Sequence, residues 1–141
     1  MLCSWSAVAL GQQAHSAWPH LMGLCNGANL SGLNLEGTGL AWAALGAANL
    51  SHSYLRKAIL TGAGMANANL SEAFLEYANL SKSDMTNADL TGADLEGANL
   101  TEVNLTGANL TGAQFKTTNF TLARWPNGRK CGYNSVGFCA R

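Results

Sequence analysis

The stretch ADLTG ADLEG ANLTE VNLTG ANLTG, from Ala88 to Gly112, decides the fold of this chain. Each block of five residues opens on Ala or Val, continues with Asn or Asp, and carries Leu at its third position. The last two positions are mostly Thr and Gly. Internal repetition is the first feature to establish in a sequence, because a repeat of fixed period determines the architecture.

The repeat extends far beyond this stretch in both directions. From Leu30 to Trp125 every fifth residue is large and apolar, in twenty successive repeats without an insertion. These residues are Leu30, Leu35, Leu40, Leu45, Leu50, Leu55, Leu60, Met65, Leu70, Leu75, Leu80, Met85, Leu90, Leu95, Leu100, Leu105, Leu110, Phe115, Phe120 and Trp125. Two positions earlier the residue is Ala in fourteen of the twenty repeats, and the residue between is Asn or Asp in twelve.

A period of five fits neither a helix nor a flat strand. Five residues of a helix rotate the apolar position by about 140°, which spreads it around every side. In a flat strand an odd period sends successive Leu residues to opposite faces. All twenty side chains stay inside only if the chain turns a corner every five residues, with the small residue also facing inward. The alternative, an Ala/Leu-rich helix, conflicts with the regular Asn, Ser, Thr and Gly, which are poor helix formers.

The unit A-[N/D]-L-[S/T]-G resembles the pentapeptide-repeat family, and the resemblance covers residues 28–127. It implies an all-β solenoid, a right-handed quadrilateral β-helix with four pentapeptides per coil, so that residue n stacks on residue n+20. Twenty repeats then make about five coils. Two features support this register: Met65 becomes the neighbour of Met85, and Tyr54 the neighbour of Phe74.

The two ends are expected to differ from the repeat body. We expect a cap in residues 1–27, the β-helix in residues 28–127 and a tail in residues 128–141. Helix-like spacing of apolar residues over residues 4–17, ended by Pro19, predicts a short helix over the first coil, with an irregular segment as the alternative. Apolar residues on the outside of that coil, Trp42 among them, suggest that something covers it.

The four cysteines lie outside the twenty repeats. A solenoid keeps its ends apart, so Cys3–Cys25 and Cys131–Cys139 are the geometrically easy pairs. The tail WPNGRKCGYNSVGFC also resembles the tail of some bacterial pentapeptide-repeat proteins. Alternatively, Cys25 is a buried thiol at the core position before Leu30. Paired cysteines predict an oxidising compartment, either periplasm, thylakoid lumen or the cell exterior. No basic residue precedes Arg56, so no complete signal peptide is visible in this chain.

Composition and motifs favour no catalytic, cofactor or metal site. The chain carries eight acidic and eight basic residues, and through Arg124 there are eight acidic residues against five basic ones, or −3. That field is too weak to predict a nucleic-acid or membrane-surface partner, and no apolar run approaches the ~20 residues of a membrane span. The histidines are His15, His20 and His52, and no metal-binding or phosphate-binding motif accompanies them.

One side of the predicted coil differs from the others. It comprises residues 33–37, 53–57, 73–77, 93–97 and 113–117, which we call the aromatic face. Its outward residues include Tyr54, Arg56, Lys57, Phe74, Glu76, Tyr77, Asp94, Glu96 and Lys116. One interpretation is a solvated ladder of ion pairs beside an ordinary aromatic stack. The other is a protein-binding patch, because exposed Tyr, Phe and Arg are typical of interaction hot spots.

The sequence therefore favours a non-enzymatic, exported scaffold that binds another protein without a cofactor. A second hypothesis is the branch of the family that mimics DNA and binds gyrase, although the chain lacks a projecting loop, a strong negative charge and the length. A third is a small-ligand binder or enzyme, which the Leu-packed interior disfavours because it leaves no pocket. The identity of the partner and the oligomeric state are not encoded in any recognisable motif.

Overall fold

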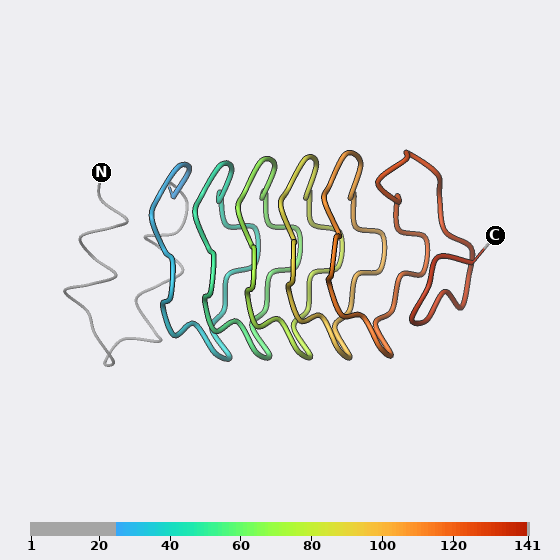
Figure 1. Cartoon of the computed structure of the whole chain (residues 1–141), viewed down its shortest axis with the longest axis horizontal. Coiled ribbons are helices and arrows are strands. Elements are labelled where there is room, and N and C mark those ends of the chain that lie inside the picture. Colours follow the sequence, from blue (N-terminus) through green and yellow to red (C-terminus); the bar gives the residue numbers. More distant parts are fainter. Residues whose placement is uncertain (1–24, 141) are drawn as a thin grey trace.

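The fold is a stack of four-sided coils, described here for residues 25–140 of a computed structural model (Figure 1). Parallel bridges join residue n to residue n+20, from Asn29–Asn49 to Asn104–Arg124, which confirms the predicted register. Within the described residues the chain forms no helix and no continuous strand. Each side of a coil contributes one bridging residue between two turns.

The coils are joined by a repeating backbone hydrogen-bond pattern. The Leu50 amide donates to the Asn69 carbonyl at 2.7 Å, and the Asn69 amide donates back to the Ala48 carbonyl at 2.9 Å. At each corner a turn closes within one coil, as where the Ala68 amide donates to the Met65 carbonyl at 3.0 Å. Backbone groups inside the stack are therefore paired by the neighbouring coil or by the corner itself.

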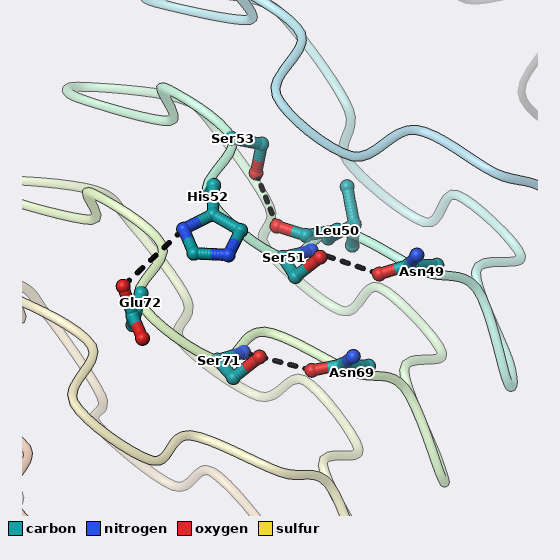
Figure 2. Close-up of polar contacts among 8 residues, drawn as sticks. All are labelled: Asn49, Leu50, Ser51, His52, Ser53, Asn69, Ser71 and Glu72. Carbon is teal, nitrogen blue, oxygen red and sulfur yellow. Dashed lines mark hydrogen bonds and ion pairs between the residues drawn. The ribbon is translucent and has the colours of Figure 1, made fainter.

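Asn and Asp recur in the repeat because their side chains hold the corners. Oδ1 of Asn49 accepts a hydrogen bond from the Ser51 amide at 3.1 Å, and Oδ1 of Asn69 accepts one from the Ser71 amide at 3.0 Å (Figure 2). This Asx turn satisfies an amide that points outward at the bend. The following residue adopts a left-handed conformation, with φ of 56° at His52, and glycine occupies many of these positions. That geometry explains the Gly of the consensus.

The core consists of stacked columns of the large residue with small residues between them. Leu80 and Met65, for example, have no exposed surface. Where the small inward residue is polar, its hydroxyl has a partner: Oγ of buried Ser53 donates to the Leu50 carbonyl at 2.7 Å (Figure 2). Thr38 and Ser83 repeat this contact, so a hydroxyl at this position carries no unpaired hydrogen-bonding group into the core.

The prediction that all twenty large residues are buried is wrong at the C-terminal end. Leu110, Phe115 and Trp125 are only partly buried, whereas Phe120 is fully buried. The physical reason is that no complete coil follows residues 106–125. The end is closed instead by an aromatic layer, in which Phe120 packs edge-on against Trp125 at 5.0 Å and against Phe115 at 5.7 Å between ring centroids.

The tail covers half of this last coil and runs antiparallel to it. Antiparallel bridges join Asn119 to Val136 and Arg124 to Lys130. The predicted Cys131–Cys139 disulfide is confirmed, with a Cα–Cα distance of 5.0 Å. Cys25 is buried, as a residue at a core position would be. The expected helix over residues 4–17 and its companion Cys3 lie outside the described residues, so the Cys3–Cys25 pair stays a prediction.

Candidate protein-binding face

Two aromatic rings stack on the outside of the aromatic face. The rings of Tyr54 and Phe74 lie 5.0 Å apart between centroids and only 7° from parallel. Their backbones are bridged, because residue 74 stands 20 positions after residue 54. Both side chains remain accessible, with 51% of Tyr54 and 40% of Phe74 exposed. The regular spacing of the coils therefore holds two large rings at the surface in a fixed position.

Tyr77 extends this aromatic surface at the adjoining corner. It is 56% exposed and has a φ of 59°. Its ring lies over Gly97 of the next coil: a Cβ atom added to Gly97 would stand 2.6 Å from Cδ1 and Cε1 of Tyr77. The glycine at this corner thus makes room for the ring, in addition to supplying the left-handed conformation.

Replacing Gly97 by Ala tests that packing. Gly37 occupies the same corner position on the same side, with a φ of 65° and no atom within 4 Å of an added Cβ. We expect Gly37→Ala to cost about 1 kcal/mol for the left-handed backbone alone. Gly97→Ala is expected to lower the urea midpoint further, because the Tyr77 ring must also move. Equal midpoints for the two variants would show that the ring does not rest on Gly97.

The charged residues of the aromatic face do not form the predicted ladder. Nε of Arg56 and Oε1 of Glu76 are 4.0 Å apart, at the limit of an ion pair. In the part of the chain that the structure describes, neither Glu96 nor Lys116 makes an ion pair. The Glu76 side chain is only 22% exposed, and its Oε2 atom is buried without a hydrogen-bond partner among residues 25–140. Glu76 is thus a largely covered carboxylate at the edge of the aromatic surface.

One exposed apolar residue near this face was not predicted from the sequence. Ile59 is 48% exposed and occupies the same place in its repeat as Tyr54 and Phe74. Its repeat position therefore indicated an outward side chain. Trp42, already noted from the sequence, is 73% exposed and its ring covers Gly62. The exposed large apolar residues of the body, residues 28–127, therefore all lie between residues 42 and 77.

His52, the histidine within the described repeat body, forms an ordinary surface contact. Its Nδ1 lies 3.3 Å from Oε2 of Glu72, and the two side chains are 61% and 67% exposed (Figure 2). An exposed pair of this kind contributes little to stability. Over residues 25–140 there is no group of three or more His, Cys, Asp or Glu residues that could hold a metal ion. No helix among those residues is long and apolar enough to cross a membrane.

Comparisons with known proteins agree with this architecture. The family model for pentapeptide repeats matches in overlapping segments, residues 25–62, 40–76, 48–87, 65–101 and 83–121. The chain therefore belongs to the pentapeptide-repeat family. No curated protein sequence matches it.

Solved structures of cyanobacterial members are similar to the chain. HetL of Nostoc sp. strain PCC 7120, a protein involved in heterocyst differentiation regulation, is 35% identical over 74% of this chain, with a TM-score of 0.66. The match covers 52% of HetL, so this chain spans about half of its length. Rfr23 of Cyanothece 51142 is 33% identical over 70% of this chain and 81% of its own, with a TM-score of 0.65.

Proposed function

We propose that this protein is a non-enzymatic scaffold that binds another protein through the aromatic face. The observation that carries the proposal is the stacked, exposed pair of Tyr54 and Phe74, with Tyr77 beside it. Aromatic residues dominate the affinity of many protein interfaces. Rings that are already fixed by the coil lose little conformational entropy when a partner binds.

The rim of the face supplies polar recognition in this proposal. Arg56 and Glu76 follow the ring-bearing residues Tyr54 and Phe74 by two positions on the same side of the coil, and their side chains are 47% and 22% exposed. A partner that places a carboxylate against the half-exposed Arg56 guanidinium gains a charge-assisted hydrogen bond at the edge of an apolar contact. Lys57 and Glu96 complete the proposed rim.

We further propose that the scaffold functions in an oxidising compartment after export. The Cys131–Cys139 disulfide supports this proposal, because such bonds persist in oxidising compartments and are rare in the cytosol. A fractionation experiment with an antibody against the chain tests it. Protein found in the cytosol, with Cys131 and Cys139 both open to alkylation, would contradict export.

The double variant Tyr54→Ser with Phe74→Ser tests the binding face. Both side chains point away from the core, so we expect the melting temperature to change little. The stacked pair itself accounts for about 1 kcal/mol of stability. Capture of protein partners from a native extract should fall by an order of magnitude or more, as expected when two central aromatic residues of an interface are removed.

Ile59→Ser is the matched control for this experiment. It removes an exposed apolar side chain from the same repeat position on the neighbouring side of the coil. We expect this variant to capture the same partners as the parent chain. If the double variant retains its partners, or if Ile59→Ser loses them equally, the aromatic face is a stabilising stack of two rings and no binding site.

A further inference from the structure

A second group of exposed apolar residues lies on the side of the coil that follows the aromatic face. We call this side and its two corners the adjoining surface, which in the first three coils comprises residues 37–42, 57–62 and 77–82. Trp42, Ile59 and Tyr77 on this surface are 73%, 48% and 56% exposed. Successive members are 17 and 18 residues apart, slightly less than one coil of 20, so they cross the surface on a diagonal from one corner to the other.

The two aromatic rings of this diagonal lie over glycine residues. A Cβ atom added to Gly62 would collide with Cε3, Cζ3 and Cη2 of Trp42, so the six-membered ring of the indole covers that glycine. The ring of Tyr77 covers Gly97 in the next coil in the same way. One face of each ring therefore rests on the backbone, and the opposite face is directed to the solvent.

An aromatic face that is fixed at a protein surface is a platform on which a sugar ring can stack. The C–H groups on one face of a pyranose ring form an apolar patch with a partial positive charge, whereas the face of an aromatic ring is negative. Because Trp42 and Tyr77 already pack on glycines, they lose little conformational entropy when a sugar binds. The diagonal thus has a platform at each end and the apolar side chain of Ile59 between them.

A polar group that can bind a sugar hydroxyl lies beside Ile59. Asn79 is bridged to Ile59 from the next coil. Its Oδ1 accepts hydrogen bonds from the amide and the hydroxyl of Ser81, at 3.2 and 2.8 Å. Its Nδ2 donates no hydrogen bond within residues 25–140, so this amide group remains a donor for a ligand.

The charges of the adjoining surface have one sign. Its three ranges contain Lys57 and Lys82 and no acidic residue. Both lysines are exposed, and neither makes an ion pair in the part of the chain that the structure describes. Lys57 precedes Tyr77 by one coil at its corner, and Lys82 follows Gly62 by one coil at the other corner, so the lysines lie on either side of the diagonal. This arrangement favours a ligand that carries carboxylate groups.

From these observations we propose that the adjoining surface binds an acidic polysaccharide, a chain of pyranose rings that carry carboxylates. Trp42 and Tyr77 each stack on one sugar ring, and Ile59 contacts the sugar between them. Lys57 and Lys82 bind carboxylates on the two sides of the chain, and Nδ2 of Asn79 donates to a hydroxyl. This binding site goes beyond the proposed protein-binding function, because Trp42, Ile59 and Lys82 lie outside the aromatic face.

A polymer fits this surface better than a single sugar does. The residues that carry the two rings are separated by about 8 Å along the axis of the coil, given a coil spacing of about 4.8 Å. One saccharide chain can contact both rings, and several weak contacts made by one chain add up to a useful affinity. A bilayer is a poorer ligand, because apolar side chains that anchor a protein to a membrane project into it, whereas these rings lie against the backbone.

Calorimetric titration of the full chain with soluble polygalacturonate tests the proposal. We expect saturable binding that weakens as salt is added, since the lysines are screened. Three other probes should bind at least ten-fold more weakly: dextran has sugar rings without charge, polyglutamate has carboxylates without sugar rings, and vesicles of phosphatidylglycerol present an anionic membrane. The proposal is overturned if polygalacturonate does not bind, or if any of the three other probes binds equally well.

Two pairs of variants locate the site. Trp42→Ala should raise the dissociation constant for polygalacturonate ten-fold or more, as for the loss of a central aromatic contact. Tyr133→Ala removes a ring that is 77% exposed on the tail and should leave the constant unchanged. Lys82→Gln should weaken binding and reduce its salt dependence, whereas Lys116→Gln, at an exposed lysine on the aromatic face, should do neither. Equal affinities within both pairs would show that the polysaccharide binds elsewhere.

The double variant Tyr54→Ser with Phe74→Ser separates this site from the proposed protein-binding face. Neither ring belongs to the adjoining surface, so we expect this variant to bind polygalacturonate as the parent chain does. Trp42→Ala should in turn capture the same protein partners as the parent. A double variant that melts normally but no longer binds polygalacturonate would place the polysaccharide on the aromatic face and overturn the proposal.

Discussion

Leu80→Asp is expected to yield a chain that does not fold. Leu80 lies in the middle of the stack with no exposed surface, between neighbours that are also fully buried. A carboxylate at this position would enter a dry apolar column without a partner, and the cost of burying such a group is several kcal/mol at least. Since a domain of this size is stable by about 5–15 kcal/mol, one such change removes much or all of that margin. Circular dichroism and thermal melting measure the loss.

Leu110→Asp is the matched control, because Leu110 holds the same position in its repeat. Leu110 is partly exposed at the open end of the last coil, where a carboxylate reaches water without unfolding a coil. We expect this variant to fold, with a far smaller loss of melting temperature. If Leu80→Asp melts at the same temperature as the parent chain, the continuous dry core is wrong.

The register of the body was predictable because a single period determines every side chain of the coil. The unbroken series of fifth residues from Leu30 to Trp125 determines the inward positions. The neighbours of each residue follow once the resemblance to the pentapeptide-repeat family adds four repeats per coil. The stacking of Tyr54 on Phe74 was derived in this way, and the rings indeed lie 5.0 Å apart. Asx turns are also typical of Asn and Asp at corners.

The C-terminal end was not predictable by the same reasoning. A periodic pattern treats Leu105 and Leu110 as equivalent, although the first has a coil on each side and the second does not. What covers the last coil depends on the path of residues 128–140, which carry no repeat. The disulfide indicated that this tail folds back, but its antiparallel direction and the two sides it covers depend on tertiary hydrogen bonds.

The pairing of long charged side chains was also not predictable from the sequence. The sequence places Arg56, Glu76, Glu96 and Lys116 in one column, and this suggested a continuous ladder of ion pairs. Position in a column fixes only the backbone, since the coil spacing leaves each side chain several rotamers to choose among. Only Arg56 and Glu76 approach each other, and Glu76 is instead largely covered at the edge of the aromatic surface. Position in a column therefore does not determine which charged side chains pair.

Phe120→Ala is expected to destabilise the C-terminal end by about 3–5 kcal/mol, the range for truncating a buried phenylalanine. Phe120 is fully buried and packs edge-on against both Phe115 and Trp125. Its amide also holds the tail through the Ser135 carbonyl. Because a solenoid coil contacts only its neighbours, the loss should be concentrated in the last coil and the tail.

Hydrogen exchange and urea unfolding together measure this local effect. We expect faster exchange at the Cys131 and Gly137 amides, which pair the tail with the last coil, and unchanged exchange at the Leu50 amide in the body. Phe138→Ala removes the same ring from a side chain that is 63% exposed, and should alter stability by less than about 1 kcal/mol. If the two variants have the same urea midpoint and the same tail exchange, Phe120 does not hold the end of the coil closed.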